Sequence, residues 1–325
     1  MTTATPLAPQ ASIIVCTRNR SELLRDCIES LLQDSSEVAR EVLVVDNGSS
    51  DDTAVVARSY VTADGGTPVR YVLAPRQGKS HALNLGVQQA AGALLLFTDD
   101  DVVVEDQWAA SLCRAMEDEG VGVVGGRVRA RWPQQPPPWL VGDVAAALGV
   151  RELGTEPKAL EPIDVIGANM ALRAADLRDI PQPFNPELGP SGKIKRDFEE
   201  LHLVEGLGAT RKLVYCPEAV VWHRIEADRM NRQWIRKMYF QRGLGRSRHD
   251  RLVGEPAAPW RERVRLAIAY YRVANSLRRH NWRKTALNAK EAFDEFDYHY
   301  WAAYHIESLL GHAPAVSGLV ARVLA

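Results

Sequence analysis

The sequence predicts an α/β fold of a mostly parallel sheet flanked by helices, with a helical C-terminal extension. Over about the first 100 residues, short segments rich in β-branched and other apolar residues alternate with segments of helical periodicity. Residues 93–98 are almost wholly apolar, as in a strand that is covered on both faces. From Glu226 onward, apolar residues recur at helical spacing. Strands joined by helices are expected to lie parallel through right-handed crossovers.

The elements follow in order from apolar periodicity and from clusters of turn-forming residues. The first helix is predicted behind Ser21, a typical N-cap residue. Four prolines in residues 133–139 end a strand and predict a loop. The predicted strands are residues 12–16, 41–45, 69–73, 93–98, 121–131, 163–173 and 212–223, and the predicted helices are residues 21–32, 53–60, 80–91 and 108–119.

The composition is that of a globular protein. The chain has 325 residues, of which 46% are hydrophobic and 25% charged, and a formal net charge of −1. The longest apolar stretch, residues 90–97, is too short to span a membrane. Residues 1–10 lack the features of a secretory signal and are expected to form a disordered tail. The four cysteines show no metal-site spacing, which favours buried thiols in a reducing, cytoplasmic compartment.

Residues 224–290 are strongly basic, with 18 Lys or Arg against 5 Asp or Glu. Such a stretch forms either a solvated helix face or a contact with an anionic partner. We expect peripheral contact with the inner face of an anionic membrane, and no binding of nucleic acid because no nucleic-acid-binding module is recognisable. Dense aromatic residues in the same region predict helix packing, a homodimer through the C-terminal helices, or membrane contact.

Three consecutive carboxylates, Asp99, Asp100 and Asp101, follow the apolar strand at residues 93–98. Like charges at one strand end repel each other unless a cation compensates them. Mg²⁺ and Mn²⁺ prefer carboxylate oxygens and are often shared with substrate phosphates. The sequence therefore predicts a divalent-metal site here, and the alternative is a solvated acidic turn.

Polar residues also follow the first two strands, as Thr17-Arg18-Asn19-Arg20 and as Asp46 in Asp46-Asn47-Gly48. Ligands of parallel sheets bind beyond the carboxyl ends of the strands, where these residues are expected to meet. Gly78-Lys79-Ser80 is not a Walker phosphate loop, because Leu73 stands where that motif needs glycine.

Taken together, these motifs resemble the family 2 glycosyltransferases with the GT-A fold. The resemblance covers residues 11–225, with residues 226–325 as a basic and aromatic helical extension. It implies a hexosyltransferase-type enzyme that moves one sugar from a UDP- or TDP-sugar to the hydroxyl of a glycan, a lipid-linked acceptor or a small molecule, with inversion. The quoted motifs are Thr17–Arg20, residues 44–53, Gly78–Gly86, Asp99–Asp101, Gly167–Arg173 and Val220–His223.

The resemblance also implies roles for individual residues. The base-binding residues would be Thr17, Asn19, Arg20 and Asp46, and Lys79 would point at the nucleotide or its diphosphate. The D-x-D pattern maps onto Asp99-Asp100-Asp101, so that Asp99 and Asp100 would contact the nucleotide sugar. The ligands of Mn²⁺ or Mg²⁺ would be Asp99, Asp101 and His223. Asn169 would lie in the strand beneath the sugar.

The catalytic base is the point at which the chain departs from the family pattern G-E-D-x-E-L. When Glu200-Leu201 is aligned with its last two residues, Phe198 stands where the base is expected. A one-residue shift favours Asp197, then Glu199, and Glu200 is the third carboxylate of this segment. If no base is present, the alternative is a silent sugar-nucleotide sensor or scaffold. A nucleotidyltransferase is a further alternative.

Overall fold

The computed structural model describes residues 9–61, 67–190, 198–282, 284 and 287–310. Most of the tail predicted at residues 1–10, and the last part of the helical extension from residue 311, therefore lie outside the described residues. The chain forms two compact units. The first comprises Met1–Arg131, Arg151–Pro186 and Glu200–Arg224, and the second Trp132–Val150, Glu187–Glu199 and Ile225–Ala325. None of the described helices is long and apolar enough to cross a membrane.

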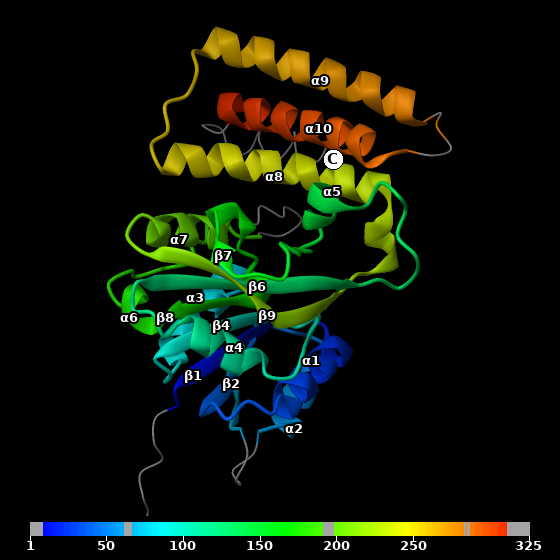
Figure 1. The fold of residues 1–325 in the computed structure, drawn as a ribbon. Coiled ribbons are helices and arrows are strands. Elements are labelled where there is room, and N and C mark those ends of the chain that lie inside the picture. The colour runs from blue at the N-terminus through cyan, green and yellow to red at the C-terminus, as the bar shows by residue number, and fades with distance from the viewer. Residues whose placement is uncertain (1–8, 62–66, 191–197, 283, 285–286, 311–325) are drawn as a thin grey trace, which may run out of the picture. The chain divides into compact units, whose positions relative to one another are not determined.

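The first unit is a sheet between two layers of helices (Figure 1). Its sheet has the strand order β3-β2-β1-β4-β8-β6-β9-β5, and β7 pairs with β9. The strands are β1 (Ala11–Thr17), β2 (Arg40–Asp46), β3 (Val69–Leu73), β4 (Leu94–Asp99), β5 (Val102–Val104), β6 (Val121–Arg131), β7 (Lys158–Ala159), β8 (Met170–Arg173) and β9 (Lys212–Arg224). The α-helices are α1 (Ser21–Gln33), α2 (Thr53–Ser59), α3 (Lys79–Gln89), α4 (Trp108–Ala115), α6 (Ala174–Leu177) and α7 (Glu199–Gly208).

Successive side chains along each strand point to opposite faces of the sheet, so the core is divided between the two helical layers. Ile13 and Val15 face the layer formed by α1, α2 and α4, whereas Ile14 and Val45 face that formed by α3, α6 and α7. Since both faces are covered, these strands are apolar almost throughout. The prediction of an α/β fold with a mostly parallel sheet is confirmed, because β3, β2, β1 and β4 are all parallel.

The strand predicted at residues 163–173 is too long. The 3₁₀ turns Pro162–Asp164 and Gly167–Asn169 precede β8, which begins only at Met170. Pro162 has no N–H to donate to a sheet, and the turn at Asn169 directs that side chain into the fold, where it binds carbonyl oxygens. β8 also runs antiparallel to both β4 and β6, so the sheet contains antiparallel as well as parallel strand pairs.

A buried carboxylate in this unit predicts acid sensitivity. Burial of Glu41 would raise its pKa, but hydrogen bonds from Ser12, Arg70 and the N–H of Ala91 outweigh burial and lower the pKa below its usual 4.5. Because the unfolded chain then binds more protons, stability is present above the unfolded pKa and is lost as pH falls through the folded pKa. We expect Glu41→Gln to be less stable at pH 7 and to lose less stability on acidification, as measured by urea unfolding between pH 7 and pH 3. An equal pH dependence in both proteins would contradict this assignment.

The second unit contains three long helices. They are α8 (Arg232–Leu252), α9 (Trp260–Trp282) and α10 (Ala289–Leu310), together with the short helix α5 (Gly142–Ala146) and the 3₁₀ turn Ala227–Met230. α10 lies between α8 and α9 (Figure 1). Trp139 and Tyr239 both pack their rings on Phe296, at centroid distances of 5.9 and 5.6 Å. Aromatic side chains therefore form much of the core of this unit.

Candidate active site

The carboxyl ends of three parallel strands meet at one edge of the sheet. Thr17 is in register with Asp46 on β2, and Cys16 is in register with Asp99 on β4. The prediction that the polar residues after these strands lie together is thereby confirmed. Parallel pairing is the cause, since it brings the carboxyl ends of β1, β2 and β4 to the same side.

The loops after β1 and β2 are tied to each other. Asn19, with a φ of +53°, accepts a hydrogen bond from the N–H of Ser50 at 2.7 Å, and its own N–H donates to Ser49 Oγ at 3.0 Å. Asp46 is buried and accepts hydrogen bonds from the N–H of Ser49 at 2.8 Å and the hydroxyl of Tyr71 at 2.9 Å. These contacts preform the surface on which the sequence predicts the nucleotide base.

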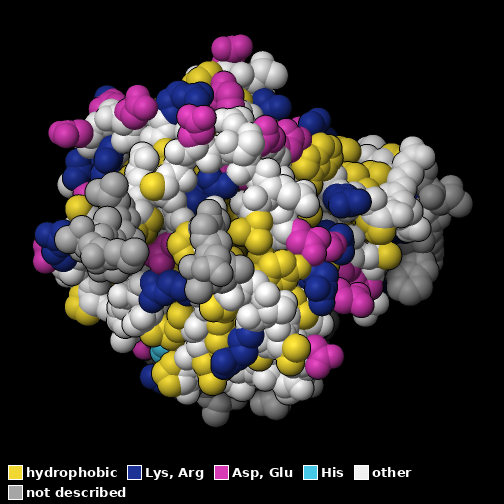
Figure 2. Space-filling model, turned by 90° about the horizontal axis from the view of Figure 1, so that it is seen from below, with side chains coloured by type: hydrophobic (Ala, Val, Ile, Leu, Met, Phe, Trp, Pro, Cys, Tyr) yellow, Lys and Arg dark blue, Asp and Glu magenta, His cyan; other side chains and the backbone are white. Residues whose placement is uncertain are grey.

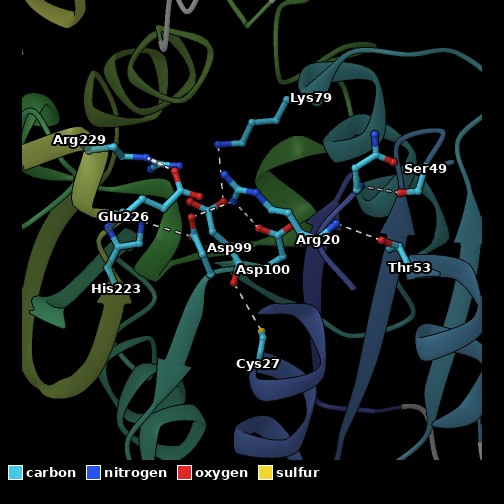
Figure 3. A network of polar contacts seen from close by, with 12 residues as sticks. Arg20, Cys27, Ser49, Thr53, Lys79, Asp99, Asp100, His223, Glu226 and Arg229 are labelled. Carbon is cyan, nitrogen blue, oxygen red and sulfur yellow. Dashed lines mark hydrogen bonds and ion pairs between the residues drawn. The ribbon is translucent and has the colours of Figure 1, made fainter. Parts of the chain in front are cut away.

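Arg20 binds the acidic cluster. Figure 3 shows Arg20 and Lys79 extended toward the carboxylates of Asp99 and Asp100. Arg20 Nη1 lies 2.7 Å from Asp100 Oδ1 and 2.8 Å from Asp101 Oδ2, and both carboxylates are buried. Burial raises the pKa of Asp100 to about 6, although the Arg20 guanidinium acts in the opposite direction. The protein thus supplies one cation of its own to the acidic cluster. This cation is Arg20, which the sequence predicts beside the nucleotide base.

Lys79 joins the acidic cluster to α7. Its Nζ lies 2.9 Å from Glu200 Oε1 and 3.7 Å from Asp99 Oδ1. Lys79 is the first residue of α3, and Glu200 is the second residue of α7. Gly167 lies against the Glu200 carboxylate so closely that a Cβ at this position would stand 2.5 Å from Oε1. Glu200 therefore has a defined position at the same edge of the sheet as Asp99.

His223 and Asp101 are neighbours, with 3.3 Å between Nε2 and Oδ1. β9 pairs antiparallel with β5 and places His223 opposite Val102, the residue after Asp101. Two carboxylates and an imidazole are suitable ligand types for Mn²⁺ and also for Mg²⁺, which favours the oxygens. Within the described parts of the chain, however, no three such side chains are already arranged around one metal position. The residues predicted as metal ligands thus fit in chemical type, and Arg20 and Lys79 lie beside their carboxylates.

The four consecutive residues around the predicted base have different surroundings. Asp197 lies outside the described residues. Phe198 is buried in the second unit with its ring 6.0 Å from that of His249, and Glu199 is fully buried. Glu200 is the described carboxylate that lies beside Lys79. In the sequence, Glu200 could have been found from the pair Glu199-Glu200 at the start of α7. It lies two residues after Phe198, the position at which the family pattern places the catalytic base.

Asn169 has a scaffold position. It is fully buried, its Nδ2 donates to the carbonyl oxygens of Arg127 and Ala219, and its Oδ1 accepts from Trp108 Nε1 at 2.9 Å. These bonds join β6, β9 and α4 beneath the strand ends. Contact of Asn169 with a donor sugar stays a prediction.

Comparison with known proteins shows the family to which the chain belongs. The family model for glycosyl transferase family 2 matches residues 12–180. The chain belongs to this family. It is 33% identical to the glycosyltransferase AglE of Haloferax volcanii over 40% of this chain and 42% of AglE. It is 27% identical to the succinoglycan biosynthesis protein ExoM of Rhizobium meliloti over 78% of this chain and 79% of ExoM.

Solved structures of glycosyltransferases share the fold of this family 2 member. The mannosyltransferase PcManGT from Pyrobaculum calidifontis, solved in complex with GDP-Man and Mn²⁺, superimposes with a TM-score of 0.64. The two chains are 17% identical, and the match covers 94% of this chain and 88% of PcManGT. The GT-A fold is therefore confirmed, and the chain is a glycosyltransferase by family.

Proposed function

We propose that this glycosyltransferase transfers a single sugar, with inversion, from a UDP- or TDP-sugar to an acceptor hydroxyl. The observation that carries the proposal is the contact chain from Asp99 through Lys79 to Glu200, at the edge where β1, β2 and β4 end. It links an acidic cluster, suited to a metal diphosphate, to a carboxylate suited to act as a base.

In this proposal the base of the nucleotide lies on the tied loops after β1 and β2, near Thr17, Asn19 and Asp46. Thr17 and Asp46 are buried, and backbone N–H groups hold Asp46 and the exposed Asn19 in place before the donor arrives. A preformed surface lowers the entropy lost on binding. Lys79, half-buried beside Asp99, faces the diphosphate.

The proposed ligands of Mn²⁺ or Mg²⁺ are Asp99, Asp101 and His223. A bound divalent ion supplies charge neutralisation to the departing nucleoside diphosphate. In this assignment Arg20 holds Asp100 and Asp101 in place through its two short contacts.

Glu200 is the proposed base. Its carboxylate accepts the proton of the acceptor hydroxyl while the oxygen forms a bond to the anomeric carbon and the bond to the nucleoside diphosphate breaks. Attack from the side opposite the leaving group inverts the anomeric configuration. Lys79 Nζ, 2.9 Å away, orients the Glu200 carboxylate.

Glycan and lipid-linked hydroxyls are the proposed acceptors, which the similarity to a succinoglycan biosynthesis protein supports. A cytoplasmic location is also part of the proposal. All four cysteines lie in the described residues and are free thiols, as in a reducing compartment. A homodimer through the C-terminal helices stays a prediction.

Product analysis tests the proposal against its two alternatives. The protein is incubated with Mn²⁺ and a panel of UDP-, TDP- and GDP-sugars, with and without glycan acceptors, and separately with nucleoside triphosphates and sugar phosphates. Release of a nucleoside diphosphate, increased by one acceptor, is expected. Release of pyrophosphate would instead identify a nucleotidyltransferase, and donor binding without turnover would identify a sensor or scaffold.

A further inference from the structure

The helices α8 and α9 both carry an excess of basic residues, but they differ in how many of these residues form ion pairs. On α8 several arginines form ion pairs within the helical unit. Arg236 pairs with Glu295, and Arg251 with Glu307, both on α10. Four of the seven Lys and Arg residues of α8 are thus ion-paired, two of them with the helix on which α8 packs.

The arginines of α9 are arranged differently. Arg261, Arg265, Arg272 and Arg279 are spaced by four, seven and seven residues, which places them on one face of the helix. All four are exposed, and none takes part in an ion pair recorded between described residues. Glu262 is the one acidic residue in the sequence of α9. We call these four residues the arginine face.

The opposite side of α9 packs on α10. Tyr270 lies against the rings of Tyr298, Trp301 and His305, at centroid distances of 5.4–6.3 Å, and Ala267 and Ala274 are buried. This packing fixes the rotation of α9 about its own axis. The arginine face is therefore directed away from α10.

Large apolar side chains are exposed beside these arginines. Ile268 is 46% exposed and lies between Arg265 and Arg272 on the arginine face. Tyr271 is 43% exposed, and Trp260, beside Arg261, is 61% exposed. On the face of the molecule drawn in Figure 2, acidic and basic side chains are interspersed with hydrophobic ones.

We propose that the arginine face of α9 docks on an anionic membrane surface. Arginines attract acidic lipid headgroups, and their long stems allow the charge to remain at headgroup level while neighbouring side chains enter the interface. Large aliphatic and aromatic side chains are typical of helices that lie in this interface. A hydrated polyanion such as RNA would match the arginines but would offer no apolar phase to Ile268. The proposal is independent of the sugar-transfer chemistry.

Vesicle sedimentation of the full chain tests this proposal. The vesicles contain phosphatidylcholine alone or with phosphatidylglycerol. The variant Arg261→Gln, Arg265→Gln, Arg272→Gln, Arg279→Gln removes the arginine face and retains helix-forming residues. The control variant Arg25→Gln, Arg114→Gln, Arg131→Gln, Arg178→Gln removes the same charge from exposed arginines of the first unit.

We expect wild type and the control to bind the anionic vesicles, and the arginine-face variant to bind them at least about tenfold more weakly. Binding should weaken with added salt. Ile268→Ser keeps every charge and is expected to weaken binding to anionic vesicles both with and without added salt. Equal losses in both quadruple variants would overturn the proposal. So would binding to single-stranded RNA, but not to vesicles, that depends on the same four arginines.

Discussion

Glu200→Gln is expected to lower the rate of sugar transfer about a thousandfold, because the amide cannot accept the proton of the acceptor hydroxyl. Nucleotide affinity should change by no more than about twofold, since the predicted base-binding and metal residues remain. Transfer is followed by release of nucleoside diphosphate, and affinity by calorimetry. Glu156→Gln is the matched control, because Glu156 is exposed and its replacement removes the same charge from the first unit.

A second variant moves the Glu200 carboxylate without removing it. A Cβ at Gly167 would stand 2.5 Å from Glu200 Oε1, so Gly167→Ala should displace this carboxylate and slow transfer while nucleotide binding persists. Full activity in Glu200→Gln would show that the base is elsewhere. Asp197→Asn would then be the next variant to assay.

Asp101→Asn has the second large expected effect, a loss of about a hundredfold in Mn²⁺-dependent nucleotide affinity. Asp101 is buried between Arg20, at 2.8 Å, and His223, at 3.3 Å, so the variant removes a charge from the centre of the proposed metal site. The measurement is nucleotide affinity with and without Mn²⁺. Asp179→Asn, at an exposed position, is the control. An Mn²⁺ effect as large in Asp101→Asn as in wild type would contradict the metal assignment.

Much of the fold could be predicted from local patterns. The strands β1 to β4 and the helices between them follow from apolar periodicity, and parallel pairing then brings Thr17, Asp46 and Asp99 to one edge. The direction of β8 was not predictable in this way, because antiparallel pairing with β4 and β6 depends on contacts between distant segments. The inclusion of Trp132–Val150 in the second unit is equally non-local.

The location of the site at the strand ends could be predicted from the sequence, but the contacts of its individual side chains could not. The sequence places Arg20 after β1, yet its two contacts are with residues 80 and 81 positions away. The proposed catalytic base illustrates the same limit, since the start of α7 at Glu199 decides which carboxylate lies beside Lys79. Likewise, basic composition alone could not separate the paired arginines of α8 from the exposed arginines of α9.

Calorimetric titration with UDP, TDP and GDP, each with and without Mn²⁺, tests most directly whether this edge of the sheet binds a nucleoside diphosphate. The proposed site predicts that UDP or TDP binds and that Mn²⁺ strengthens this binding about a hundredfold. Absence of binding for all three nucleotides in the presence of Mn²⁺ would contradict the assignment of Asp99, Asp101 and the β1 and β2 loops to a donor site.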